Sequence, residues 1–217
     1  MIEGAVFDMD GVLVDNARYH IRAWQQLGLE LGKNLGDEDI RAVFGQRNRE
    51  MLAILISRTF SEEEIARHTR HKEEIYRGII GPELVPLPGL MEFLAELKKA
   101  AIKIAVATSG PKDNVRFVLE RLALEPWFDQ VVTGIDVANS KPAPDIFLLA
   151  ARRLGLPAER CLVFEDSTAG IEAAHRAGSP CIALSTTHTV EELSRTSTCK
   201  VIHDFTEIRV SDLQQIP

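Results

Sequence analysis

The chain has 217 residues, of which 45% are hydrophobic and 26% are charged, and its formal net charge is -7. A chain of this length can bury a full core and carry one domain with a smaller insertion. The negative net charge argues against a nucleic-acid surface or an anionic-membrane surface, because either would need clustered lysine and arginine.

Cysteine spacing and the N-terminal residues predict the compartment. Cys161, Cys181 and Cys199 show neither metal-binding nor redox spacing, which favours a reduced environment. The N-terminal MIEGAVFDMD carries acids inside its apolar run, so we expect no signal peptide, and no apolar run approaches a membrane span. We therefore expect a soluble cytoplasmic protein, a monomer or weak dimer, that binds neither nucleic acid nor membrane.

Short apolar runs rich in β-forming residues recur along the chain and predict strands. They cover residues 4–7, 102–107, 131–133, 161–164 and 181–184. Runs without polar alternation suit strands that are buried on both faces of a parallel sheet. Helical patterns follow at 89–100, 113–122, 144–154 and 167–177. This alternation predicts an α/β fold with a doubly wound, Rossmann-like parallel sheet.

One interval, residues 16–81, contains helical patterns and no convincing strand. Its last helix begins with a capping box, in which Ser61 and Glu64 satisfy each other's amides. The interval predicts an all-α domain inserted after the first strand. We expect a core domain from residues 1–15 and 82–217 and a helical cap domain from residues 16–81.

Polar side chains follow four of the predicted strands. In chain order they are Asp8 and Asp10, Thr108 and Ser109, Lys141, and Glu165 and Asp166. Ligands of doubly wound sheets bind beyond the carboxyl ends of the strands, so these side chains should meet at one edge. Carboxylates as close as the first pair repel each other unless a cation or a reaction uses them. The pattern therefore indicates a catalytic or metal-binding edge.

Four motifs in this order resemble those of the haloacid dehalogenase superfamily, in the branch of β-phosphoglucomutase and sugar phosphatases with a helical cap. FDMDGVLVDN resembles the first motif, ATSG the second, SKPAPDIF the third and FEDSTAGIEAAHRAG the fourth. The resemblance covers essentially the whole chain and agrees with the predicted core and cap. It implies a Mg²⁺-dependent phosphoryl-transfer enzyme that acts on a small phosphorylated metabolite.

The resemblance also implies a role for each motif residue. Asp8 would be the nucleophile that forms an aspartyl-phosphate. Asp10 would be the general acid and base, with a pKa raised by Asp8 and by partial burial. Thr108 and Lys141 would hold the phosphate oxygens, helped by the main-chain amide of Ser109.

The implied ligands of Mg²⁺ are the carboxylates of Asp8, Asp166 and Glu165, with the main-chain carbonyl of Asp10. Mg²⁺ prefers such oxygen donors together with water and a substrate phosphate. The second aspartate favours phosphoryl transfer over carbon–halogen hydrolysis, because a dehalogenase has no leaving alkoxide to protonate.

The cap carries three candidate phosphate-binding residues, His20, Arg49 and Lys72, at positions that resemble β-phosphoglucomutase. A packed helix histidine and two solvated helix charges would give the same sequence. Asn16 in place of a hinge threonine and a longer segment at 108–122 depart from the mutase pattern. The longer segment leaves open whether Lys112 contacts phosphate.

Three functions are therefore open. We favour a phosphatase that acts on a sugar phosphate, because this branch holds more hydrolases than mutases. A β-phosphoglucomutase-type isomerase comes second. A non-catalytic binding module of the same fold comes third, because it should lack a motif residue and none is missing here.

Overall fold

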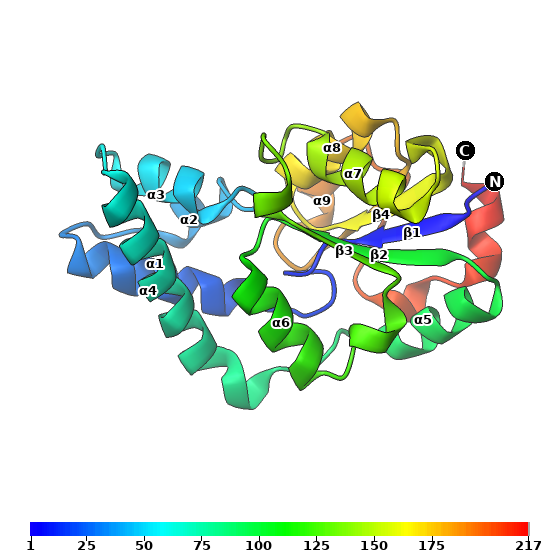
Figure 1. Ribbon diagram of the computed structural model, residues 1–217, viewed down its shortest axis with the longest axis horizontal. Coiled ribbons are helices and arrows are strands. Elements are labelled where there is room, and N and C mark those ends of the chain that lie inside the picture. The colour runs from blue at the N-terminus through cyan, green and yellow to red at the C-terminus, as the bar shows by residue number, and fades with distance from the viewer. Residues whose placement is uncertain (217) are drawn as a thin grey trace.

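Within residues 1–216, which the computed structural model describes, six parallel strands form one sheet in the order β3-β2-β1-β4-β5-β6 (Figure 1). The strands are β1 (Gly4–Phe7), β2 (Lys103–Thr108), β3 (Gln130–Thr133), β4 (Cys161–Glu165), β5 (Cys181–Leu184) and β6 (Lys200–Ile202). Strand order reverses direction between β1 and β4, which is the switch point of a doubly wound sheet.

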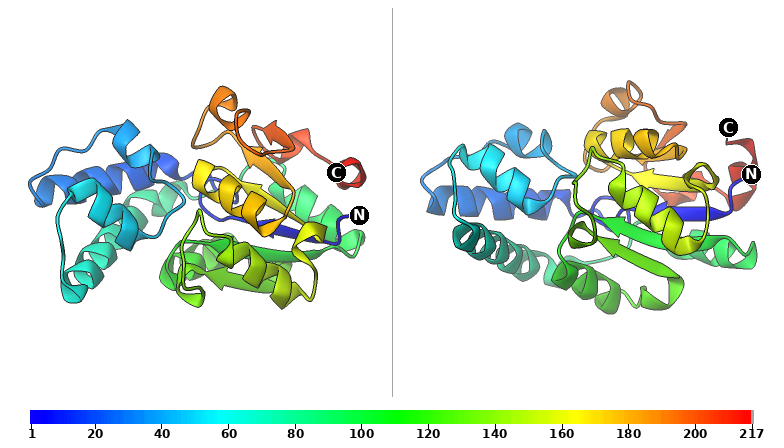
Figure 2. Two further views of the ribbon diagram at one scale, coloured as in Figure 1. Left: turned by 90° about the horizontal axis from the view of Figure 1, so that it is seen from above. Right: turned by 45° about the horizontal axis from the view of Figure 1, so that its top comes forward.

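Helices cover both faces of this sheet. In Figures 1 and 2, α5 and α6 lie on one face, and α7 and α8 lie on the other. The core helices are α5 (Leu90–Lys99), α6 (Lys112–Arg121), α7 (Asp145–Leu154), α8 (Thr168–Ala177) and α9 (Val190–Leu193). The predicted fold class is confirmed.

Alternate residues of the strands supply the two halves of the core. Phe7 and Phe164 point to the face that carries α5, and their rings stack with centroids 4.7 Å apart. Val6 and Val163 point to the opposite face and join the apolar cluster beneath α7. Because both faces are covered, the strands need apolar residues at every position, which explains why no polar alternation is seen.

The α-helices between β1 and α5 form a separate layer beyond the carboxyl ends of the strands, blue to teal in Figure 1. They are α1 (Ala17–Glu30), α2 (Asp37–Arg41), α3 (Asn48–Ile56) and α4 (Glu62–Ile80). Trp24 and Leu52 belong to a buried apolar cluster that only this layer supplies. We propose that these helices are the predicted cap domain; its boundaries at residues 16 and 81 stay a prediction.

The predicted strands coincide with β1 to β5, with ends shifted by at most one residue. The capping box at the start of α4 is present, and the Glu64 amide donates to Ser61 Oγ at 3.2 Å. β6 was not predicted, because it is a three-residue edge strand that begins with an exposed lysine. None of the helices in residues 1–216 is long and apolar enough to cross a membrane.

Candidate active site

The strand ends bring the predicted site residues to one edge of the sheet. Asp8 follows β1, Thr108 ends β2 and Glu165 ends β4. Phe7 pairs with Phe164 in parallel register, so the residues that follow them lie level with each other. The apolar strands thus fix polar side chains at their carboxyl ends, where the cap covers them.

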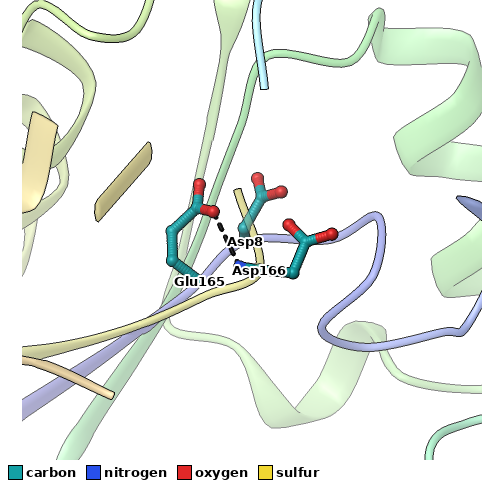
Figure 3. A group of neighbouring side chains, drawn as sticks. All are labelled: Asp8, Glu165 and Asp166. Atoms are coloured by element: carbon teal, nitrogen blue, oxygen red, sulfur yellow. Dashed lines mark hydrogen bonds between the residues drawn. The ribbon is translucent and has the colours of Figure 1, made fainter. Parts of the chain in front are cut away.

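Three carboxylates face one small space at this edge (Figure 3). Asp8, Glu165 and Asp166 each offer one oxygen, and these oxygens lie within 4.8 Å of one another. Burial, reinforced by the other two carboxylates, raises the pKa of Asp166 well above its usual range. Oxygen donors without histidine or cysteine suit a hard divalent cation, which would offset the repulsion among them.

The Lys141 ammonium lies between the carboxylates of Asp8 and Glu165. Its Nζ is 3.1 Å from Asp8 Oδ1 and 2.5 Å from Glu165 Oε1. Burial lowers the pKa of Lys141, but these carboxylates outweigh burial and raise the pKa above its ordinary value. Apart from the ion pair with Lys141, Asp8 Oδ1 has no polar partner in the described part of the chain. Burial raises the pKa of Asp8 to about 7, and Lys141 offsets only part of this effect.

Both oxygens of Glu165 are occupied by protein donors. Oε1 accepts from Lys141, and Oε2 accepts from the amides of Asp166 and Ser167, each at 2.8 Å, and from the Ser167 hydroxyl at 2.9 Å. These bonds fix the carboxylate and leave it few lone pairs for a metal. A ligand role for Glu165 stays a prediction, and its contacts here orient Lys141.

Asp10 is partly exposed and is held by the cap. Asn16 Nδ2 donates to Asp10 Oδ1 at 2.5 Å, and His20 Nε2 lies 3.4 Å from the same oxygen. Partial burial by itself raises the pKa of Asp10, but His20 and Asn16 lower it below its ordinary 3.8. The prediction of a raised pKa is therefore wrong for this arrangement, because cap side chains outweigh burial and the neighbouring Asp8.

The second motif serves both the pocket and the cap. Thr108 Oγ1 accepts from the Gly110 amide at 3.0 Å, so its hydroxyl hydrogen is free to donate to a ligand. Ser109 Oγ donates to the main-chain oxygen of Gly45 in the cap at 2.6 Å, which leaves its amide for the predicted phosphate contact. Lys112 is exposed at the start of α6 and does not belong to the described lining of the pocket that contains Asp8 and Asp166.

His20 and Lys72 meet above the carboxylates. Lys72 Nζ donates to His20 Nδ1 at 2.6 Å, and the lysine side chain is only 2% exposed. The His20 ring stacks on Tyr76, with centroids 3.8 Å apart, and the Tyr76 hydroxyl accepts from Asn16 at 2.7 Å. These contacts connect the cap to Asp10.

Arg49 is not brought together with the other two cap residues. Its side chain is 52% exposed, and its Nη1 donates to Glu62 Oε1 at 2.8 Å. The predicted role of Arg49 as a phosphate ligand stays a prediction.

Two adjacent cavities lie between cap and core. The inner pocket encloses about 70 Å³, and its lining includes Asp8, Asp10, Asp166 and Lys72. The outer chamber encloses about 430 Å³ and contains Arg49. The residues that line both cavities are Asn48, Glu73, Ser109, Gly110 and Pro111.

Sequence reasoning missed Asn48 and Glu73. A signal for the inward face of α4 was present, because Ile65, Lys72 and Tyr76 recur at helical spacing. That stripe indicates that Lys72 and its neighbour Glu73 lie toward the interior. The charged run KEE at residues 72–74 instead suggested a helix face that is exposed to solvent.

Comparisons with known proteins agree on one family. The model of the haloacid dehalogenase-like hydrolases matches residues 2–178. A phosphorylated carbohydrates phosphatase from Thermotoga maritima is 36% identical over 177 residues, which cover 82% of each chain. A β-phosphoglucomutase from Bacillus subtilis is 32% identical, and the match covers 82% of this chain and 80% of that protein. A solved structure of a CbbY mutant from Rhodobacter sphaeroides, in complex with xylulose 1,5-bisphosphate, is 30% identical with a TM-score of 0.86 and covers 98% of this chain and 99% of that one.

The matched segment contains all four strand ends of the site, and the shared fold extends over nearly the full length of both chains. The relatives include a phosphatase and a phosphoglucomutase, both of which handle phosphoryl groups. The chain belongs to the haloacid dehalogenase-like hydrolase family and is a phosphoryl-transfer enzyme.

Proposed function

We propose that this chain is a Mg²⁺-dependent phosphatase that hydrolyses the monophosphate of a small carbohydrate through an aspartyl-phosphate on Asp8. Asp8 carries the proposal, because it is buried at the end of β1 and its Oδ1 has no polar contact among the described residues other than the ion pair with Lys141. A carboxylate held by one ammonium group keeps lone pairs available to attack phosphorus. The carbohydrate is supported by the relative named as a phosphorylated carbohydrates phosphatase.

In the first step, an Asp8 oxygen bonds to phosphorus while the bond from phosphorus to the leaving oxygen breaks. Asp10 gives its proton to that oxygen, so that the leaving group departs as a neutral alcohol. A phosphate dianion beside Asp10 raises the pKa of that carboxyl and favours the protonated form. Lys141 and the Thr108 hydroxyl stabilise the negative charge on the other phosphate oxygens.

In the second step, Asp10 is a carboxylate and removes a proton from a water molecule. The water oxygen bonds to phosphorus, the bond to Asp8 breaks, and inorganic phosphate leaves with the Asp8 carboxylate restored. His20 and Asn16 keep Asp10 pointed at this position in both steps. The cycle consumes one water and needs no other reactant.

The carboxylates of Asp8 and Asp166, with the main-chain carbonyl of Asp10, would hold Mg²⁺. The all-oxygen donor set fits this ion. When bound, the ion would neutralise charge between the attacking carboxylate and the anionic phosphate. Glu165 would support the site through Lys141.

Release of inorganic phosphate from a panel of sugar monophosphates tests this proposal. We expect turnover with Mg²⁺ that EDTA abolishes. We expect Asp8→Asn to lower kcat by at least about a thousandfold, because an amide oxygen is a poor nucleophile. Asp15→Asn removes a charge at an exposed position of the same loop and should keep wild-type activity. Full activity of Asp8→Asn, or undiminished rates in metal-free buffer, would refute the mechanism.

An isomerase remains the alternative, and Arg49 separates the two functions. A mutase must grip the second phosphate of a bisphosphate, so Arg49→Ala should lower isomerisation by orders of magnitude. A phosphatase needs no such grip, and the exposed Arg49 already pairs with Glu62. We expect Arg49→Ala to cost about tenfold or less in kcat/KM, mostly through KM. Stoichiometric conversion of β-glucose 1-phosphate to glucose 6-phosphate would decide for the mutase.

A further inference from the structure

Glu73 is a buried carboxylate in the wall between the inner pocket and the outer chamber. It lies on α4, its side chain is 5% exposed, and it contributes to the lining of both cavities. Oε1 accepts from Lys72 Nζ at 2.9 Å and from Asn48 Nδ2 at 2.5 Å. Oε2 accepts from Asn114 Nδ2 at 2.5 Å. Donors from the cap and from the core thus fix this carboxylate in the lining that the two cavities share.

The Glu73 carboxylate stays charged at neutral pH. Burial by itself raises its pKa, but Lys72 and His20 outweigh burial and hold the pKa below its ordinary 4.5. Glu73 therefore places one fixed negative charge beside Lys72, which is the one lysine in the described lining of the inner pocket. The positive charge of Lys72 is neutralised before any ligand arrives.

The outer chamber holds further cations. Arg49 forms a two-armed ion pair with Glu62, whereas Arg70 and Arg77, which also line the chamber, pair with no carboxylate in the described part of the chain. A second phosphate at the wall between the two cavities would approach the Glu73 carboxylate and would have to displace it to reach Lys72. Like charges at close range in a site with little water cost more than in bulk solvent.

A sugar hydroxyl meets the opposite situation. An ionised carboxylate offers about four lone-pair positions, and Lys72, Asn48 and Asn114 account for three of them. The remaining position can accept a hydroxyl hydrogen of the leaving group. The amide group of Asn48, which lines both cavities, is an additional hydrogen-bonding partner for a neutral polyol.

We infer that Glu73 determines substrate specificity: it accepts a hydroxyl of a neutral polyhydroxy leaving group and repels a second phosphate. This inference rests on the phosphatase function proposed above and narrows its substrate class to monophosphates of neutral polyols. Specificity of this kind is a difference between two affinities, and here the repulsive element is visible in the free protein.

The test compares two ligands that differ by one phosphate, fructose 1-phosphate and fructose 1,6-bisphosphate. Calorimetry with Mg²⁺ gives the dissociation constant of each for proteins that also carry Asp8→Asn, which prevents turnover. We expect Glu73→Gln to lower the ratio of the bisphosphate constant to the monophosphate constant at least tenfold. Glu74→Gln removes the same charge from the next, exposed residue of α4 and should leave the ratio within twofold.

Two further variants separate specificity from folding. Glu73→Asp keeps the charge and should keep a ratio close to that of the parent protein, even if the shorter side chain lowers the melting temperature. The double variant Lys72→Gln with Glu73→Gln should lose the gain in bisphosphate affinity. In the single variant Glu73→Gln, the Lys72 ammonium is the group that would bind the second phosphate. An unchanged ratio in Glu73→Gln, or an equal loss of affinity for both ligands, would overturn the inference.

The outcome does not depend on the reaction. If the wild-type protein releases no phosphate from any sugar phosphate, the proposed function fails, while the ratio of dissociation constants still judges Glu73. If phosphate release is normal and the ratio is unchanged, only the specificity inference fails.

Discussion

Two aspartates that are separated by one residue differ in pKa because they face different partners. Asp8 is enclosed by the core, and burial raises its pKa to about 7. Asp10 faces the cap, where His20 and Asn16 keep its pKa below the ordinary value. The proposed cycle needs an ionised Asp8 and a protonated Asp10, so both shifts have to be offset when the cation and the substrate phosphate bind.

At the same scale, His188 should make stability depend on pH. Its side chain is 12% exposed, and Glu192 lies 3.9 Å from its Nδ1. Burial lowers the pKa of His188 below 6.5, and Arg41 reinforces this effect, whereas Glu192 and Glu165 oppose it. The unfolded chain then binds the proton more readily, so this contribution to stability is present above pH 6.5 and is lost as the pH falls below it.

We expect the melting temperature of the wild type, relative to His188→Gln, to fall by a few degrees at most between pH 7.5 and 5. His175→Gln makes the same change at an exposed position of α8 and should show no such trend. A wild-type melting temperature that rises relative to that of His188→Gln as the pH falls would contradict the assigned direction of the pKa shift.

The sequence could predict which side chains meet at the sheet edge, because each follows a buried strand. It could not predict the charge state of Asp10, because that depends on cap residues that approach only in the folded chain. Glu73 was missed for a related reason, since its partner Asn114 lies in a different domain of the predicted division. Residue type and local period were readable, whereas contacts between distant segments were not.

At the scale of elements, α8 supports the site through its first turn. Ser167 caps the helix by accepting from the Gly170 amide at 3.1 Å, and its hydroxyl also donates to Glu165. A β-carbon at Gly170 would overlap the Glu165 carboxylate. This carboxylate cannot move aside without loss of its bonds to Lys141 and Ser167. Helix, cap residue and site are therefore one packed unit.

Gly170→Ala and Gly78→Ala should have opposite effects, although both exchange a helical glycine for the better helix former. At Gly78, on α4, a β-carbon would meet no heavy atom within 4 Å, so alanine should stabilise the protein by about 0.5–1 kcal/mol. At Gly170, alanine should displace Glu165, lower the melting temperature and reduce kcat at least about tenfold. Equal stabilisation at both positions would show that the Glu165 carboxylate moves away from the new β-carbon without loss of stability.

Periodicity was also sufficient to predict most elements and insufficient for the short ones. The strands that are buried on both faces gave continuous apolar runs, which made them readable in the sequence. β6 has three residues and an exposed first position, so its sequence carries little signal. The prediction of an all-α insertion held, because the amphipathic helices of that segment bury an apolar cluster of their own.

For the whole molecule, the cap meets the core through apolar packing, to which Tyr19 and Tyr76 contribute, and through a few polar contacts. Arg47, at the start of α3, donates to the main-chain oxygens of Gly134, Val137 and Ala138 at 3.2, 3.4 and 3.0 Å. These carbonyls belong to the core segment after β3. Neither the guanidinium nor the carbonyls carry a sequence signature, so this connection was not predictable.

Arg47→Met should weaken closure of the cap while leaving each part folded, because methionine keeps much of the apolar stem but removes the hydrogen bonds. We expect kcat/KM to fall about tenfold or more, since bonds from a charged donor contribute about 1.5–3 kcal/mol each when made. Small-angle X-ray scattering should show a larger radius of gyration, with little change in melting temperature. Arg58→Met is the matched control, because Arg58 pairs with Glu64 inside the cap alone. Unchanged kcat/KM and an unchanged radius of gyration in Arg47→Met would show that other contacts keep the cap closed on the core. The hydrogen bonds of Ser109 with Gly45 and of Arg77 with Asn114 would be the next to test.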